Sequence, residues 1–130
     1  MEHEQELVQA FHEKYGFPRG MLIRGGFEHV DWLDVGFQRD RLMSEELNEW
    51  RTAWHNKDLL GVADAMGDLA YTVLGTAVVT GIQLGPILRE IHKSNMTKDV
   101  GMFKPIKGKL FRLPELRPIL MKQGFDIRQL

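Results

Sequence analysis

Residues 59–81 read LLGVADAMGDLAYTVLGTAVVTG and carry the longest helical pattern of the chain. At about 100° per residue, one broad side of the expected helix is apolar. That side consists of Val62, Met66, Leu69, Ala70, Val73 and Ala77. The opposite stripe combines small residues with two carboxylates: Gly61, Asp64, Asp68, Tyr71, Thr72 and Gly75. Because the stripe lacks the Lys–Glu pairs of a solvated face, we expect Asp64 and Asp68 to lie in a cleft between two helices.

A second acidic cluster lies on the helix expected just before this one, over residues 34–55. Glu45 and Glu49 are four residues apart and Glu46 and Glu49 three, so the three side chains share one sector. Residues 56–58 form a short connection, which favours antiparallel packing of the two helices. A glutamate cluster alone is usually a solvated face, but here the facing aspartates would join it. Only hard divalent cations, which take oxygen ligands, would stabilise such a gathering.

We therefore expect a magnesium site, with manganese as the alternative. Its expected ligands are Glu45, Glu46, Glu49, Asp64 and Asp68. A di-iron carboxylate site is excluded, because it requires Glu-x-x-His on paired helices. The residues three positions after the relevant glutamates are Glu49, Thr52 and Lys93. A P-loop and a Gly-x-Ser-x-Gly elbow are also missing from the sequence.

The remaining sequence predicts an all-α bundle of four to five helices in a single domain, residues 1–130. Further helices are expected over residues 2–15 and 84–96, with a last short helix from Pro114 to Gly124. Residues 16–34 contain four glycines and predict a loop. The basic loop and the last helix together occupy residues 99–130. No repeat and no convincing strand pattern is present.

Composition limits the class of protein. With 130 residues, 43% hydrophobic and 27% charged, the chain fits one globular domain. The absence of cysteine excludes disulfides, thiolate zinc sites and cysteine catalysis, and it fits a cytoplasmic location. The acidic N-terminus does not resemble a signal peptide. The longest apolar run, residues 69–82, is shorter than the roughly 20 residues that span a bilayer, so no membrane partner is expected.

Charge is distributed unevenly along the chain. Residues 1–85 carry 14 acidic and 7 basic side chains, a net of −7, and residues 86–130 carry 4 acidic and 10 basic, a net of +6. An acidic body with a basic C-terminal third suits a ligand that presents both bound metal and bare phosphate oxygens. Equally, the two halves could simply attract each other. The acidic majority opposes binding of nucleic acid.

Two further groups of side chains, one polar and one aromatic, each allow two interpretations. His92, Asn95 and Lys98 recur at a spacing of three and could bind a base or sugar edge and a phosphate. Alternatively they form an exposed helix end, where Lys98 complements the helix dipole. Three aromatic side chains could stack on a base, although core packing is the favoured fate of each. They are Phe37, Trp50 and Trp54.

Several segments together carry a family resemblance. They are VQAFHEKYGFP at 8–18, EELNE at 45–49, DAMGDLAY at 64–71, GTA at 75–77, GI at 81–82 and HKSNMTK at 92–98. From about residue 8 to 122 the chain resembles the all-α nucleoside triphosphate pyrophosphohydrolases. This superfamily includes MazG-like proteins and phosphoribosyl-ATP pyrophosphohydrolase.

The resemblance implies magnesium-dependent cleavage between the α- and β-phosphates, releasing a nucleoside monophosphate and pyrophosphate. By position, Glu46, Glu49 and Asp68 would be metal ligands. Glu45 would be a further ligand or the catalytic group that orients and deprotonates the attacking water. The family's usual Glu-x-x-Asp pair would place a glutamate at position 65. This chain has Ala65 there, and Asp64 is the expected substitute.

The resemblance also implies nucleotide contacts and partners. Asn95 and Lys98 would contact the nucleotide. Beyond the resemblance, we expect His92 and Tyr71 to bind substrate as well, and Lys104, Lys107 or Lys109 to help hold the phosphates. Because so short a helical hairpin buries its apolar faces poorly, we expect a homodimer or a dimer of dimers. The alternatives are hydrolysis of phosphoribosyl-ATP in histidine synthesis, a non-catalytic nucleotide-binding protein of the same fold, and a purely structural oligomer.

Overall fold

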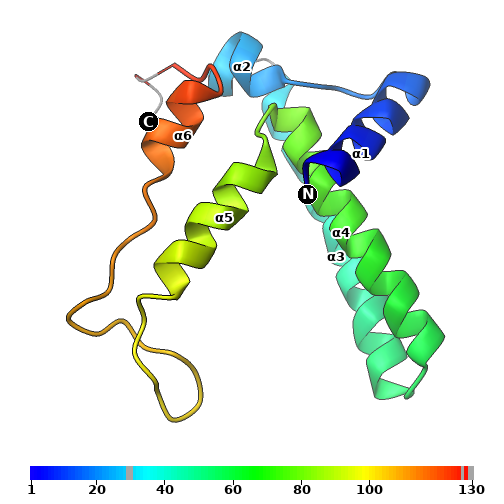
Figure 1. Ribbon diagram of the computed structural model, residues 1–130. Helices are drawn as coiled ribbons and strands as arrows, with labels where there is room; N and C mark the ends of the chain where they lie inside the picture. The colour runs from blue at the N-terminus through cyan, green and yellow to red at the C-terminus, as the bar shows by residue number, and fades with distance from the viewer. Residues whose placement is uncertain (29–30, 127, 129–130) are drawn as a thin grey trace.

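The computed structural model describes residues 1–28, 31–126 and 128, and it confirms the all-α fold class (Figure 1). In chain order the helices are α1 (Glu2–Tyr15), α2 (Met21–Gly25), the 3-10 helix η1 (Gly26–Glu28), α3 (Trp32–His55), α4 (Leu59–Thr80), α5 (Leu84–Asn95) and α6 (Leu116–Lys122). The expectation of a plain loop over residues 16–34 was wrong, because α2 and η1 lie within it. Over the described positions, the extended pairing is limited to one isolated bridge between Asp99 and Ile106.

An antiparallel hairpin of α3 and α4 forms the body of the molecule (Figure 1). The turn between them is tight: Lys57 adopts a left-handed conformation with φ of 56°. Asp58 then caps α4, since its Oδ1 accepts a hydrogen bond from the Gly61 N–H at 3.0 Å. Such a cap satisfies one of the unpaired N–H groups at a helix start. The turn and the cap together fix the register in which α4 returns along α3.

The buried core lies where α1 crosses the C-terminal half of α4 (Figure 1). Val8, Leu74 and Val78 form its centre, with Leu84 packed against them. The predicted apolar side of α4 is only partly correct, because Ala77 is buried but Met66 is 57% exposed. The reason is that α1 covers α4 only near its C-terminal end. Gly75, expected on the opposite stripe, is buried at this crossing.

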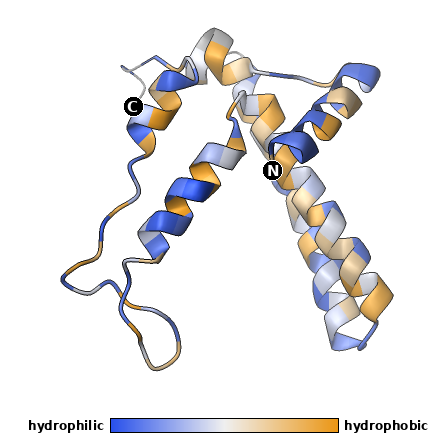
Figure 2. Ribbon diagram, viewed as in Figure 1, coloured by the Kyte–Doolittle hydropathy of each residue, from blue (hydrophilic) through white to orange (hydrophobic). Residues whose placement is uncertain are grey.

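The C-terminal third, which we call the arm (residues 84–126), diverges from the hairpin (Figure 1). The loop after α5 alternates hydrophobic and hydrophilic stretches (Figure 2). Its apolar side chains are largely in solvent, with Val100 97% and Phe103 95% exposed. The accessible surface of the chain is 9675 Å², whereas a compact monomer of this mass exposes about 7,000 Å². The helical bundle is therefore open.

Helix α4 is long and apolar enough to cross a membrane by length and composition alone. A core helix passes the same test, so this is weak evidence. Here α4 packs along α3 and α1 and carries Asp64 and Asp68. These features are typical of a helix that packs within a bundle, and 33% of its most apolar window is buried in this chain.

Side chains of α1 and α3 meet α4 at Gly75, which gives a testable prediction. A Cβ on Gly75 would lie 2.6 Å from Arg39 Nη2 and 3.1 Å from His12 Nε2. Gly75→Ala is expected to lower the free energy of unfolding by about 1–3 kcal/mol, since both side chains must move. Gly67, on the same helix, has no atom within 4 Å of that position. Gly67→Ala should instead be neutral or stabilising by up to about 1 kcal/mol. Urea unfolding measures both, and equal effects would contradict the prediction.

Candidate functional site

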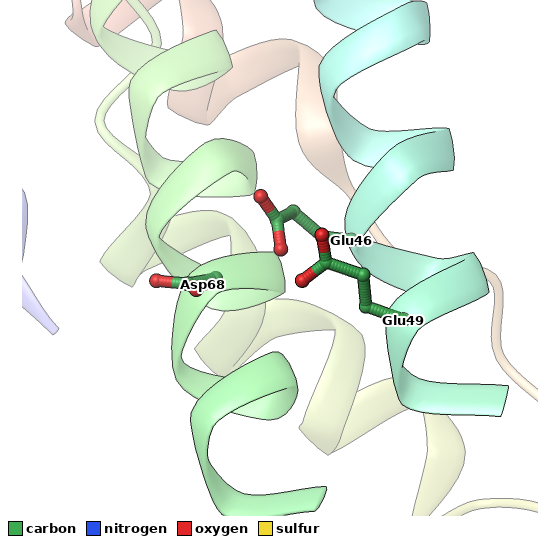
Figure 3. Close-up of side chains that lie close together, drawn as sticks. All are labelled: Glu46, Glu49 and Asp68. Carbon is green, nitrogen blue, oxygen red and sulfur yellow. The ribbon is translucent and has the colours of Figure 1, made fainter. Parts of the chain in front are cut away.

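Three of the five predicted acidic residues converge between the two hairpin helices (Figure 3). Glu46 and Glu49 come from adjacent turns of α3, and Asp68 faces them from α4. One carboxylate oxygen from each residue lies within 4.8 Å of the others. Glu46 is half-buried, whereas Glu49 and Asp68 are exposed. We call these three residues the carboxylate triad.

The triad is electrostatically unfavourable as it stands. Burial raises the pKa of Glu46, and the negative charges of Glu49, Asp68 and Glu45 raise it further. The Glu46 Oε2 atom is buried and has no hydrogen-bond partner in the structure. Within the described part of the chain, no lysine or arginine forms an ion pair with the triad. An unpaired buried carboxylate oxygen is costly, and a hard divalent cation would relieve it, so these residues fit such an ion.

The other two predicted acids lie outside the triad. Glu45 is exposed, and its Oε1 accepts a hydrogen bond from Arg41 Nε at 3.2 Å. Asp64 is also exposed and lines a separate cavity of about 380 Å³, which it shares with Glu49. Ala65 is only 2% exposed and packs inside the hairpin. Successive helix positions differ by about 100°, so Asp64 points away from the side that position 65 presents to α3.

A cavity of about 340 Å³ opens directly beside the triad. It is lined by Phe11, His12, Phe17, Gln38, Arg39, Leu42, Glu46, Asp68, Tyr71 and Thr72. Aromatic rings form part of its wall: the Phe11 centroid lies 5.5 Å from that of Tyr71 and 5.8 Å from that of Phe17. Tyr71, expected to bind substrate, therefore lies next to the carboxylates. The cavity joins an aromatic surface to an acidic one.

Sequence reasoning assigned no role to the cavity residues from α1 and the start of α3. Phe11, His12 and Phe17 lie in the segment 8–18, which contributed to the family resemblance without a function attached. Arg39 looks like an ordinary helix-surface cation in the sequence. The available signal was the concentration of aromatic side chains around His12 in that segment.

The predicted nucleotide contacts on the arm do not reach the triad within one chain. His92, Asn95 and Lys109 are exposed, Lys98 is half-buried, and none of them lines the cavity beside the triad or the one at Asp64. His92 and Asn95 lie on α5, and Lys98 and Lys109 lie in the loop after it. Helix α5 diverges from the hairpin (Figure 1). A single chain therefore separates the acidic and basic parts of the expected site.

Core packing, the favoured fate of the three candidate stacking aromatics, was wrong for two of them. Phe37 is 65% and Trp54 64% exposed. Trp50 is half-buried and stacks on Trp54 with 5.5 Å between ring centroids. The reason is that α3 packs on α4 along one side only, which leaves its other sides in solvent.

The structure is that of an all-α protein whose antiparallel helical pair brings three carboxylates together beside a cavity, a donor set that suits a divalent cation. The family of phosphoribosyl-ATP pyrophosphohydrolase matches residues 29–95, which is half of the chain and includes the whole triad. The chain belongs to this family, and thereby to the all-α NTP pyrophosphohydrolase (MazG-like) superfamily. The comparison with curated proteins gives no match.

Proposed function

We propose that the protein hydrolyses a nucleoside or deoxynucleoside triphosphate to the monophosphate and pyrophosphate, with magnesium at the triad. The single observation that carries this proposal is the convergence of Glu46, Glu49 and Asp68 around the buried, unpartnered Glu46 Oε2. These residues lie inside the segment that matches the pyrophosphohydrolase family. Manganese is the alternative ion, since it accepts the same oxygen ligands.

Each residue has a distinct task in this proposal. The triad would hold the cation, which when bound neutralises phosphate charge and acidifies water. Glu45 would orient the attacking water and take its proton, after leaving Arg41. That exchange is inexpensive, because an exposed ion pair contributes little stability. Asp64 would be an outer ligand reached through a change of rotamer.

A nucleotide panel tests the proposal directly. With Mg²⁺, at least one (deoxy)nucleoside triphosphate should yield pyrophosphate and a monophosphate, and no orthophosphate. Removal of the metal with EDTA should abolish turnover, and Mg²⁺ or Mn²⁺ should restore it, because the carboxylate oxygens alone cannot hold the phosphates. Phosphoribosyl-ATP belongs in the panel as the runner-up substrate, given the matched family.

Other outcomes would contradict hydrolysis between the α- and β-phosphates. A rise in melting temperature with nucleotide, without turnover, would indicate a non-catalytic binding protein. No response to metal or nucleotide would indicate a structural oligomer. Release of orthophosphate would place the cleaved bond elsewhere.

The absence of cysteine and the acidic balance of the chain support a cytoplasmic protein that does not bind nucleic acid.

We further infer that a second copy of the chain completes the molecule, as a homodimer or a dimer of dimers. The accessible surface exceeds that of a compact monomer by about 2,700 Å². Obligate dimers bury roughly 1,000–2,500 Å² on each subunit. The excess surface is therefore of the size that a dimer interface would cover.

Charge indicates which surfaces would meet. The hairpin lies in the part of the chain with a net charge of −7, and nearly all of the arm lies in the part with +6. Apolar side chains are exposed both on the arm, at Met102 and Phe103, and at the hairpin turn, at Leu59 and Leu60. In this arrangement the arm of one copy covers the acidic hairpin of the other. Lys98 and Asn95 would then reach the triad across the interface.

A further inference from the structure

Arg39 is a half-buried cation that lines the cavity beside the triad. Its Nε donates to Thr76 Oγ1 at 3.1 Å, and its Nη2 donates to the Thr72 carbonyl at 2.8 Å. Across the described residues, no carboxylate lies within ion-pair distance of Arg39. A guanidinium has five N–H groups, so three of them remain without a described acceptor. A desolvated cation with spare donors is costly unless a ligand supplies acceptors.

His12 contributes an acceptor next to these donors. The side chain is only 2% exposed, and its Nδ1 lies 3.2 Å from the Pro18 carbonyl oxygen. Because a carbonyl can only accept, Nδ1 carries the hydrogen and Nε2 is the acceptor of the neutral ring. Burial lowers the pKa of His12, and the charges of Arg39 and Arg19 lower it further. The ring therefore stays neutral near pH 7.

The two side chains meet beside Gly75. Arg39 Nη2 and His12 Nε2 lie 2.6 Å and 3.1 Å from the position that a Cβ would occupy on Gly75. Arg39 and His12 both line the cavity beside the triad, so guanidinium donors and an imidazole acceptor lie next to each other on its wall. Phe11, Phe17 and Tyr71 supply ring surfaces around it, and stacking on aromatic rings is how proteins hold planar bases.

The spacing from the triad suits a nucleotide. Arg39 precedes Glu46 by seven residues, which is two turns and about 10.5 Å along α3, on nearly the same side of the helix. A nucleotide with its phosphates at the triad can therefore direct its base towards Arg39 and His12. The aromatic walls favour a base at this end over a further phosphate.

We propose that this cavity selects an oxo-base, meaning a nucleobase with a carbonyl oxygen beside a ring N–H; this inference rests on the proposed function. Guanine, hypoxanthine, uracil and thymine present that edge. The carbonyl oxygen accepts from Arg39, and the ring N–H donates to His12 Nε2. In guanine, N7 beside O6 offers Arg39 a second acceptor. Adenine and cytosine place an amino donor where the carbonyl would be, opposite a guanidinium that can only donate.

The test compares kcat/KM for pyrophosphate release from GTP against ATP, and from UTP against CTP. The wild type should prefer the oxo member of each pair by about 10- to 100-fold, the range for one well-made contact to a base edge. Arg39→Gln should bring each ratio close to one, by losing activity on GTP and UTP. Arg51→Gln is the matched control, because Arg51 is an exposed arginine of the same helix whose one hydrogen bond among the described residues is to Asn48. It should retain the wild-type ratios.

Several results would overturn the proposal. Equal use of the four nucleotides by the wild type, or preference for ATP and CTP, contradicts it. An equal loss on all four substrates in Arg39→Gln would place Arg39 on the phosphates. Calorimetric binding of GMP and AMP to the wild-type protein decides the question if Arg39→Gln does not fold, since the oxo-base should bind more tightly. The same measurement separates this inference from catalysis: failure to release pyrophosphate removes the proposed function, whereas equal binding of GMP and AMP removes the base selection.

Discussion

Glu46→Gln is expected to reduce pyrophosphate release by at least about 1,000-fold, and Asp68→Asn by a similar factor. Each change removes one charged ligand from the triad. Metal coordination stabilises the transition state by several kcal/mol, and about 4 kcal/mol corresponds to a factor of 10³ in rate. The measurement is kcat/KM with the best nucleotide of the panel at saturating Mg²⁺.

The stability of the same variants separates loss of chemistry from loss of fold. In the metal-free protein Glu46→Gln should raise the melting temperature, because it removes a charge that is partly buried and repelled by Glu49 and Asp68. The increase in melting temperature that Mg²⁺ causes in the wild type should disappear. Glu6→Gln, an exposed residue on α1, is the matched control and should behave as wild type. Activity of Glu46→Gln within tenfold of wild type would remove the triad from the mechanism.

The sequence predicts the helices well where they are long. The bounds of α1 match the expected 2–15, and α4 ends one residue before the expected position. The bounds of α4 are readable in the sequence because Asp58 caps its start and Gly81 caps its end. Helices α2 and η1 were missed, since five and three residues are too few to show a helical period. Short helices of this kind depend on tertiary packing, which a single sequence does not show.

The convergence of the triad could be predicted from residue spacing along the two long helices. Spacings of three and four residues fix which side chains share a helix face, and a short turn brings two such faces together. That reasoning is accurate to about one residue, which is why Asp64 was placed with Asp68 although it lies outside the triad. The pocket around His12 and Arg39 requires α1 to cross α4, and no local pattern encodes that crossing.

The position of the arm could not be predicted from the sequence. The sequence predicts a helix over residues 84–96 and a basic loop after it, but it does not say whether the surface that covers them belongs to the same chain or to another copy. The structure leaves this loop exposed, with Val100 and Phe103 almost fully in solvent. Lys98 is separated from the triad because the arm diverges from the hairpin. Whether Lys98 acts on the triad of a second copy can be measured by mixing variants.

Mixing two inactive variants should restore activity if the arm completes the site of a second copy. The Glu46→Gln chain has an intact arm, and a chain with both Asn95→Ala and Lys98→Ala has an intact triad. The double variant should lose about 10- to 150-fold in kcat/KM from the lysine alone, because a lysine–phosphate contact contributes about 1.5–3 kcal/mol. After the two chains are unfolded and refolded together in equal amounts, random pairing joins an intact triad to an intact arm in roughly a quarter of the sites. Activity should rise to about that fraction of the wild-type value.

The matched control for this recovery is a mixture of Glu46→Gln with Asp68→Asn. Both changes lie in the triad, so every site in that mixture lacks one acidic ligand and no activity should return. Light scattering on the wild type should show a dimer or a tetramer, because a monomer has no second arm to contribute. Activity that stays at the level of the separate variants would mean that the arm acts on its own triad, or that Lys98 has no part in the site. Recovery in the first mixture and not in the control follows only if the acidic and basic parts of one site come from different chains.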